Sequence, residues 1–466
     1  MTYKGNRMKV PERIFREYDI RGVWGTDLTG EGVCAIGRAF AWRLRELFPG
    51  VKGKNPAVTI GRDARTSSPL MLEALAAALT ESGLDVIDIG VCPTPLQYFS
   101  LFKLPVQGGL MITASHNPAE YNGLKISMGT ETIHGEDIQK IRRAVEEDRT
   151  VEGCLRGTLN RRQIIPDYME YMRAQFTRFD GIKAVLDAGN GVAGMVAPGL
   201  FEELGAETVC LYCDPDGRFP NHHPDPIVAE NLKDLIAAVK DGRADLGIGY
   251  DGDGDRIGVV DGDGEIIWGD RLLALFARDV LSRNPGATII GEVKCSQALY
   301  DDIEARGGKP LMWKTGHSLL KSKMRECGAL LAGEMSGHIF FKERYLGYDD
   351  AIYASLRLME ALKRNGPPYS VKRLLAGLPR LHSTPEIRVD CPDDRKFPVV
   401  ERLREELRRS HSIIDIDGVR VRYPEGWGLV RASNTQPALV LRFEANSPEA
   451  LITIRRDLEG RLQKLL

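Results

Sequence analysis

The sequence lacks any long apolar segment. None of its apolar runs approaches the ~20 residues of a membrane-spanning helix. Residues 1–7, Met-Thr-Tyr-Lys-Gly-Asn-Arg, lack the apolar stretch of a signal peptide. Neither sign of charge is in excess, since 63 basic residues face 65 acidic ones and the net charge is −2. We therefore expect a cytoplasmic protein that binds neither nucleic acid nor a membrane surface.

Cysteine is also sparse. The eight cysteines are scattered, and only Cys210 and Cys213 form a CxxC pair. A zinc site of this kind usually needs a second pair, and cytoplasmic proteins keep their thiols reduced. We therefore predict free, mostly buried thiols and no zinc site.

The sequence does contain a pattern of alternating strands and helices that is repeated three times. The predicted strands are 57–61, 85–90, 109–113, 183–187, 207–212, 245–249, 287–291, 310–314 and 329–332, and the predicted helices are 69–82, 194–204, 230–240, 296–306 and 318–326. Strands that alternate with helices of this length predict mostly parallel sheets in α/β domains. The last strand of each repeat ends in an unusual polar loop, and ligand sites in such folds lie at the carboxyl ends of strands.

The pattern changes beyond residue 370. The predicted order is strand 386–389, helix 399–409, a hairpin of 418–423 and 427–431, strand 438–445 and helix 447–465. This order predicts an α+β domain with an antiparallel sheet. Because 466 residues are too many for one core, we predict about three or four domains. For four domains, the expected boundaries are 1–158, 159–262, 263–372 and 373–466.

The polar loop of the second repeat reads Asp251-Gly-Asp-Gly-Asp-Arg256. Its glycines can adopt backbone conformations that other residues avoid, so the three carboxylates can converge on one hard divalent cation. Three protein oxygens would leave positions open for a phosphate, which is how Mg²⁺ is usually bound. Arg256 adds a fork of donors that suits phosphate.

Two other interpretations of this loop compete with a metal site. An EF-hand loop would have glycine at its sixth position and glutamate at its twelfth, where this chain has Arg256 and Gly262. An ordinary turn is the second alternative, because Asp and Gly dominate turns. Downstream, Asp261-Gly-Asp-Gly-Glu265 is predicted to be such a hairpin turn. The third aspartate and the arginine favour metal binding by the first loop.

The polar loop of the first repeat contains Ser115, in the run Thr113-Ala-Ser-His-Asn-Pro118. One interpretation is a serine that caps a helix or turn. A serine hydrolase would need a Gly-x-Ser-x-Gly elbow, which this run lacks. The third interpretation is a serine that carries a phosphoryl group, whose charge the aspartate-bound cation would compensate if the two loops meet.

The C-terminal domain contributes the loop Arg431-Ala-Ser-Asn-Thr-Gln-Pro437, between its last two strands. An arginine, two hydroxyls and an amide in a tight loop can form a phosphate cradle. Ser, Asn and Thr also favour plain turns, so both interpretations stay open for this loop.

Four motifs, in this order along the chain, resemble those of the α-D-phosphohexomutases, bacterial phosphomannomutase/phosphoglucomutases above all. They are Thr113–Pro118, Asp251–Arg256, Gly333-Glu-Met-Ser-Gly-His338 and Arg431–Thr435. The resemblance extends along essentially the whole chain. It implies three similar α/β domains with mixed, mostly parallel sheets and a C-terminal α+β domain with an antiparallel sheet, around a central cleft.

The resemblance also implies which residues form the site. Ser115 corresponds to the phosphoserine, and together with Asp251, Asp253 and Asp255 it would bind Mg²⁺. The other catalytic positions are Arg21, Lys125, Arg256 and His317. The positions that would bind the sugar phosphate are Tyr18, His116, Lys294, Glu334, Ser336, His338, Arg431, Ser433, Asn434 and Thr435.

The implied reaction interconverts hexose 1-phosphate and hexose 6-phosphate, of mannose or glucose. It passes through a hexose 1,6-bisphosphate, which turns around between two phosphoryl transfers. A base must take the sugar hydroxyl's proton and an acid must protonate Ser115, and Lys125 and His317 are the candidates. Lys125 would need a lowered pKa to act as a base, and we expect neighbouring Arg and Lys side chains to lower it.

Three other functions compete with this one. A phosphoglucosamine mutase usually has another residue where Met335 stands. A Mg²⁺-dependent sugar phosphatase would use the aspartates and Ser115 but would not need a second phosphate cradle. A structural protein that binds divalent ions would leave Ser115 and the 431–435 loop without a purpose.

Overall fold

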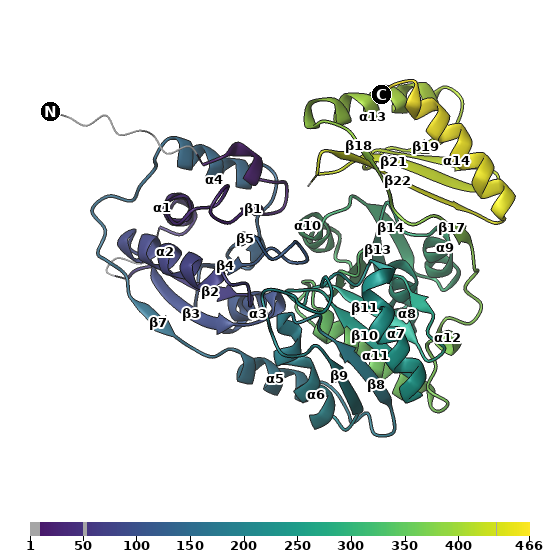
Figure 1. Cartoon of the computed structure of the whole chain (residues 1–466), viewed down its shortest axis with the longest axis horizontal. Helices are drawn as coiled ribbons and strands as arrows, with labels where there is room; N and C mark the ends of the chain where they lie inside the picture. Colours follow the sequence, from purple (N-terminus) through teal and green to yellow (C-terminus); the bar gives the residue numbers. More distant parts are fainter. Residues whose placement is uncertain (1–9, 50–53, 435) are drawn as a thin grey trace. The chain divides into compact units, whose positions relative to one another are not determined.

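The computed structural model describes residues 10–49, 54–434 and 436–466 (Figure 1). The chain forms two compact units, and each is built from two segments that are distant in sequence. The first unit comprises Met1–Trp268 and Ser336–Leu374, and the second comprises Gly269–Met335 and Leu375–Leu466.

The first sheet of the first unit is mixed. Its order is β1-β5-β4-β2-β3-β7, with β6 paired to β5. Strands β2, β3, β4 and β7 are parallel, whereas β1, β5 and β6 pair antiparallel. The elements are β1 (Ile20–Val23), α1 (Gly30–Leu47), β2 (Ala57–Arg62), α2 (Ser68–Glu81), β3 (Asp85–Val91), α3 (Thr94–Lys103), β4 (Gly108–Ile112), β5 (Tyr121–Met128), β6 (Glu131–Thr132), α4 (Glu136–Glu146) and β7 (Leu159–Arg161).

Helical spacing of apolar side chains explains how α1 and α2 cover this sheet. Ile36 and Phe40 on α1, and Leu75 and Leu79 on α2, are fully buried in one core with Ile60 of β2. Both helices therefore present one apolar stripe to the sheet.

The second sheet of the first unit has the order β12-β11-β10-β8-β9. Strands β8, β9 and β10 are parallel, and β11 and β12 extend the sheet antiparallel. Its elements are α5 (Ile165–Arg173), β8 (Lys183–Asp187), α6 (Ala197–Glu203), β9 (Glu207–Leu211), α7 (Lys233–Gly242), β10 (Leu246–Tyr250), β11 (Ile257–Asp261) and β12 (Ile266–Ile267). The later segment of the unit adds β16 (Ile339–Phe341), α11 (Ala351–Asn365) and α12 (Val371–Leu374).

The second unit contains three parallel strands and a separate antiparallel sheet. The parallel strands run in the order β14-β13-β15, and the antiparallel sheet has the order β17-β22-β21-β20-β19 with β18 on β22. The first group consists of α8 (Gly269–Arg283), β13 (Thr288–Glu292), α9 (Gln297–Ala305), β14 (Lys309–Trp313), α10 (His317–Cys327) and β15 (Leu331–Gly333). The second consists of β17 (His382–Ser383), β18 (Ile387–Asp390), α13 (Asp393–Arg408), β19 (Ser412–Ile414), β20 (Val419–Tyr423), β21 (Gly426–Ala432), β22 (Ala438–Ala445) and α14 (Pro448–Gln463).

Two helices cover one face of the antiparallel sheet. Helices α13 and α14 lie on the same side of it (Figure 1), and their Leu403 and Leu458 share a core with Leu441 of β22. On β21, Trp427 belongs to a smaller cluster with Val293, the residue after β13. The antiparallel sheet is therefore attached to the parallel strands of its own unit through apolar contacts.

The predicted fold class is confirmed: three sheets are mostly parallel and the last is antiparallel. The three polar loops follow β4, β10 and β15, as expected. The four domain boundaries stay a prediction. Within the described segments, no helix is both long and apolar enough to cross a membrane.

Some predicted elements were wrong in detail. Helix α13 begins at Asp393 rather than at residue 399, with Pro398 inside it. Asp393 and Asp394 in its first turn suit the positive end of a helix, which favours the earlier start. Residues 194–204 form a short 3₁₀ turn followed by α6 rather than one helix. All eight cysteines are free, but only Cys92, Cys295 and Cys391 are buried.

Candidate active site

Ser115 lies in the loop that follows β4, and its side chain is directed at the aspartate loop. Its hydroxyl donates to Oδ2 of Asp251 at 2.7 Å and lies 3.1 Å from Nδ1 of His116. Its backbone N–H donates to Oγ1 of Thr113 at 2.9 Å. The residue is 2% exposed. The two loops therefore meet, as the phosphoserine interpretation requires.

The aspartate loop connects β10 to the antiparallel β11. Asp251, Asp253 and Asp255 are fully buried, and one carboxylate oxygen from each lies within 4.8 Å of the others. Glycine is required at position 252 because a Cβ there would lie 2.6 Å from the carbonyl oxygen of Ser115. Gly254 has a φ of +74°, in the region that favours glycine. Gly254 thus acts as the sequence predicted, whereas Gly252 is required for the close approach of the two backbones rather than for a positive φ.

Threonine side chains hold the central aspartate from outside the loop. Oδ2 of Asp253 accepts hydrogen bonds from Thr94 at 2.7 Å and from Thr113 at 3.3 Å. Thr94 opens α3, and its backbone N–H also donates to the carbonyl of Asp253. Sequence analysis did not identify Thr94, because a threonine at a helix start is ordinarily a local feature.

Lys125 lies on β5, next to β4, and its ammonium group sits among the carboxylates. Its Nζ donates to Oδ2 of Asp253 at 2.7 Å and also contacts Asp255. Burial alone would lower the pKa of Lys125, but the charges of Asp253 and Asp255 raise it well above its ordinary value. The expectation that Arg and Lys neighbours lower this pKa was therefore wrong, because the nearest charged groups are anions.

The aspartate loop fits a divalent cation. Oδ1 of Asp253 and Oδ1 of Asp255 are buried and accept no hydrogen bond from any described residue. Burial and then the charge of Asp253 raise the pKa of both Asp251 and Asp255. Such crowding of carboxylates is what a bound cation relieves, and oxygen ligands suit Mg²⁺.

Arg256 and His338 extend the site toward a residue that sequence analysis missed. Nε of Arg256 donates to Nε2 of His338 at 2.9 Å, and Nδ1 of His338 lies 3.0 Å from Oδ2 of Asp349. Asp349 is fully buried. It precedes Asp350, which caps α11, so its sequence context indicates only a helix start.

Two further predicted residues flank Ser115. Arg21, on β1, donates to Oδ1 of Asn117 at 2.6 Å and pairs with Asp19. His116 is half-buried, and its desolvation followed by the charges of Arg256 and Arg21 holds its pKa well below the usual range. Tyr18 is also buried in this unit.

The remaining predicted residues belong to the second unit, apart from Ser336, which is half-buried in the first. Lys294 pairs with Glu386 at 2.9 Å and with Glu292 at 3.5 Å. Burial would lower the pKa of Lys294, but these two carboxylates raise it. Lys294 in turn lowers the pKa of Glu386 to about 2.

Glu292 connects three loops of the second unit. Its carboxylate accepts from the backbone N–H of Lys294 and Met335 and from the hydroxyl of Thr315. Glu334 accepts from the N–H of Gly316 at 2.7 Å, immediately before His317 opens α10. Lys294, His317 and Glu334 are therefore brought together by one buried carboxylate that sequence analysis did not find.

Asp417 performs a similar role for the C-terminal loop. Its Oδ2 accepts from Nε of Arg431 at 3.0 Å and from the N–H of Thr315 at 3.1 Å. Ser433 accepts from the N–H of Gln436 at 3.1 Å, as in a tight turn. Asn434 follows it, and Thr435 lies outside the described residues.

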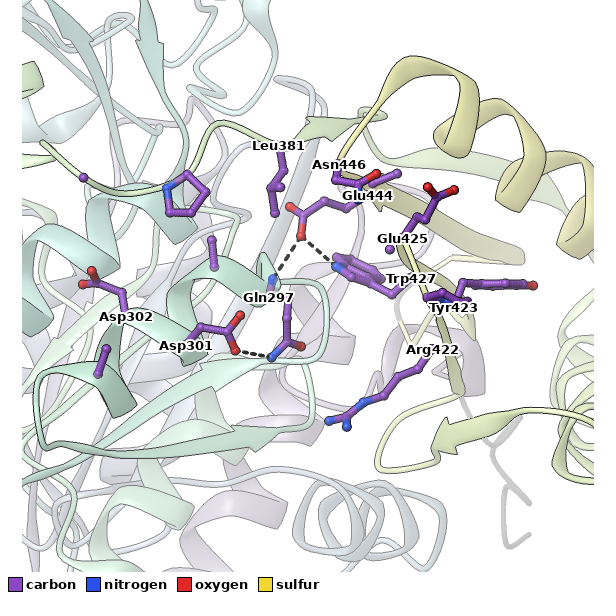
Figure 2. A pocket seen from close by; sticks show the side chains of 17 residues that line it. Gln297, Asp301, Asp302, Leu381, Arg422, Tyr423, Glu425, Trp427, Glu444 and Asn446 are labelled. Atoms are coloured by element: carbon purple, nitrogen blue, oxygen red, sulfur yellow. Dashed lines mark hydrogen bonds between the residues drawn. The ribbon is translucent and has the colours of Figure 1, made fainter.

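A cavity of about 620 Å³ in the second unit has none of these residues in its lining. Figure 2 shows one carboxylate oxygen of Glu444 joined by dashed lines to both Gln297 and Trp427. Oε1 of Glu444 accepts from the N–H of Gln297 at 3.0 Å and from Nε1 of Trp427 at 2.8 Å. This carboxylate thus joins α9 to the antiparallel sheet.

Family models match nearly the whole chain. Residues 12–152, 166–264 and 268–380 match alpha/beta/alpha domains I, II and III of phosphoglucomutase/phosphomannomutase, and residues 386–460 match its C-terminal domain. The chain belongs to the phosphoglucomutase/phosphomannomutase family. As a member, it is a hexose-phosphate mutase, the activity that the sequence predicted.

Relatives of this phosphoglucomutase/phosphomannomutase family member match nearly its whole length. The phosphomannomutase/phosphoglucomutase of Pseudomonas aeruginosa is 49% identical over 455 residues, which cover 97% of this chain and 96% of the relative. The phosphoglucomutase of Neisseria gonorrhoeae is 46% identical, and the match covers 95% of both chains. The crystal structure of a family protein from Burkholderia thailandensis has a TM-score of 0.90 at 44% identity and covers 98% of both chains.

Proposed function

We propose that this mutase moves a phosphoryl group between O1 and O6 of a hexose through a phosphoserine at Ser115. The observation that carries the proposal is the 2.7 Å contact between the Ser115 hydroxyl and Asp251 in the buried aspartate cluster. The phosphoserine would phosphorylate the free sugar hydroxyl and produce a hexose 1,6-bisphosphate. After this intermediate turns around, its other phosphate would return to Ser115 and leave the isomeric monophosphate.

Asp251, Asp253 and Asp255, with an oxygen on Ser115, would hold Mg²⁺, which when bound supplies positive charge to the phosphoryl oxygens. The donor set supports this assignment, because it consists of oxygens alone and two of them lack hydrogen bonds from described residues.

Cationic side chains of the first unit would stabilise the same charge. Arg256 and Arg21 present guanidinium groups suited to phosphate oxygens. Proton transfer to and from Ser115 and the sugar is assigned to Lys125 and His317.

Substrate recognition is assigned to the remaining polar residues. Glu334 and Ser336 would contact sugar hydroxyls, and the 431–435 loop would bind the phosphate that is not reacting. The other proposed contacts with the sugar phosphate are Tyr18, His116, Lys294 and His338.

Mannose and glucose phosphates are the proposed substrates, with the bisphosphate as activator. The loop Gly333-Glu-Met-Ser-Gly-His338 resembles that of enzymes that use both sugars, and the relative from Pseudomonas aeruginosa is named for both activities. All eight cysteines are free, as in a reducing compartment, which supports a cytoplasmic location.

Product analysis with three substrates tests this proposal. Glucose 1-phosphate and mannose 1-phosphate should both be converted to their 6-phosphates, and glucosamine 1-phosphate much more slowly. Release of free phosphate would indicate a phosphatase, and preference for the amino sugar would indicate a phosphoglucosamine mutase.

Mass spectrometry of the intact protein tests the role of Ser115. We expect one phosphate on the active protein and none on Ser115→Ala, which should lose nearly all turnover. Ser127→Ala is the matched control, because Ser127 is a fully buried serine on β5 with no assigned role. An active protein without phosphate at Ser115 would contradict the mechanism.

A further inference from the structure

Arg65 is a fully buried arginine, and every N–H group of its guanidinium donates a hydrogen bond within the protein. It lies between β2 and α2 and is 1% exposed. Nη1 donates to the carbonyls of Pro118 at 2.5 Å and Tyr121 at 3.0 Å. Nη2 donates to the carbonyls of Ser115 at 2.9 Å and Asn117 at 2.6 Å. All four acceptors belong to the segment that carries Ser115 from β4 to β5.

The fifth donor of the guanidinium anchors Arg65 to the first sheet. Nε donates to Oδ2 of Asp63 at 3.1 Å, while Oδ1 of Asp63 accepts from the Arg65 N–H and from Ser68. The N–H of Asp63 donates to the carbonyl of Ile112, the last residue of β4. A buried charge is tolerated only when it is paired and hydrogen-bonded, and here every donor has a partner.

The ring of Phe219 covers the guanidinium from another loop of the same unit, with its centroid 5.1 Å from Cζ of Arg65. Nearby, a Cβ on Gly217 would lie 2.2 Å from the carbonyl oxygen of Ala64, so the two loops are in close backbone contact. Arg65 is therefore sealed away from any substrate.

The segment held by Arg65 contains an unfavourable backbone conformation. Ser115 has a φ of +51°, in the left-handed region that residues other than glycine enter at a cost. Such a conformation persists only when its surroundings over-determine it. At Ser115 the carbonyl is fixed by Arg65 and the N–H by Thr113.

We propose that Arg65 is a positioning residue for phosphoryl transfer. Its fork of donors holds Ser115 in the left-handed conformation that directs Oγ at the aspartate cluster. Arg65 thereby sets how fast Ser115 accepts and releases a phosphoryl group, without touching the sugar phosphate. This inference rests on the proposed role of Ser115.

The test compares Arg65→Lys with the wild-type protein. A lysine keeps the charge but cannot bond four carbonyls in fixed directions. We expect kcat to fall about a hundredfold, as for small misplacements of a reacting group. KM should change little, because no contact with the substrate is lost. Phosphorylation of the dephosphorylated protein by glucose 1,6-bisphosphate should slow by a similar factor.

Recovery of kcat on addition of guanidinium ion distinguishes a positioning role from a purely structural one. In Arg65→Ala, millimolar guanidinium chloride should restore part of the kcat, whereas an equal concentration of sodium chloride should not. Arg357→Lys is the matched control, because Arg357 is equally buried in this unit but pairs with Glu343. This control should lower the melting temperature and leave the kcat of the folded protein unchanged.

Asp63→Asn keeps the inference testable if the Arg65 variants do not fold. An asparagine cannot accept both from Arg65 Nε and from Ser68 without presenting its amide to one of them. We expect kcat to fall about tenfold. Unchanged kcat and phosphorylation rate in Arg65→Lys, or in Asp63→Asn if only that variant folds, would overturn the positioning role. An active Ser115→Ala would instead overturn the proposed function itself.

Discussion

Arg256 donates through Nε to Nε2 of His338 at 2.9 Å. Because Nε2 accepts this bond, a neutral His338 ring carries its proton on Nδ1. That nitrogen lies 3.0 Å from the buried carboxylate of Asp349. Asp349 thus orients the His338 ring, and that ring orients the guanidinium of Arg256, the last residue of the aspartate loop.

We predict that Asp349→Asn lowers kcat by about tenfold to a hundredfold, with a smaller effect on KM. Loss of the carboxylate frees the imidazole to rotate and removes its support for Arg256. Steady-state kinetics with glucose 1-phosphate measures this. Asp350→Asn is the matched control and should keep its kcat, since Asp350 faces Tyr168 and Tyr345. Equal kcat values for Asp349→Asn and wild type would remove Asp349 from the site.

Metal dependence is the second prediction. Chelation should abolish turnover and Mg²⁺ should restore it, and Asp253→Asn should weaken Mg²⁺ binding and catalysis together. Asp261→Asn is the control, because this buried aspartate caps the neighbouring hairpin turn and lies outside the cluster. Full activity after rigorous chelation would rule out the role assigned to the three carboxylates.

The third prediction concerns Arg431. Both orientations of the bisphosphate need the distal-phosphate contact, so Arg431→Ala should raise KM, lower kcat and release more free 1,6-bisphosphate per turnover. The loss should be on the order of 2–4 kcal/mol of transition-state stabilisation. Labelled substrate with chromatographic counting of bisphosphate measures it, and exposed Arg422→Ala is the control. Unchanged KM and bisphosphate release would contradict the role of this loop.

The fourth prediction concerns pH and the stability of the first unit. Burial raises the pKa of Asp350 to about 6, although hydrogen bonds from tyrosine hydroxyls oppose the shift. An unfolded aspartate titrates near 3.9, so between about pH 4 and 6 the folded protein binds the extra proton. Stability therefore falls as pH rises through this window, by about 3 kcal/mol at most.

Asp350→Asn should remove this dependence on pH. The measurement is urea unfolding of the wild type and of Asp350→Asn at several pH values from 4 to 8. Exposed Asp241→Asn should retain the wild-type profile. Parallel profiles for wild type and Asp350→Asn would show that Asp350 does not titrate in this range.

Sequence patterns predicted much of this molecule because the informative residues are close together in the chain. The three aspartates, their glycines and Arg256 form one loop, and Ser115 lies at the end of a strand. Strands and helices of the repeats were located for the same reason, since their periodicity is local.

Contacts between distant segments could not be predicted in this way. Thr94 and Asp349 look like residues at helix starts, and Glu292 looks like the end of a strand. The pKa of Lys125 was predicted with the wrong sign because its neighbours, Asp253 and Asp255, come from another sheet. Electrostatics depends on such neighbours more than on the residue itself.

The backbone contact between Gly252 and Ser115 restricts which sequences can form this site. A methyl group at position 252 would meet the Ser115 carbonyl at 2.6 Å, so every other amino acid would push the two loops apart. In terms of genetic variation, Gly252 thus tolerates substitution no better than the three aspartates beside it, although it has no side chain. A missense change at Gly252 would inactivate the protein while leaving every chemically functional group in place.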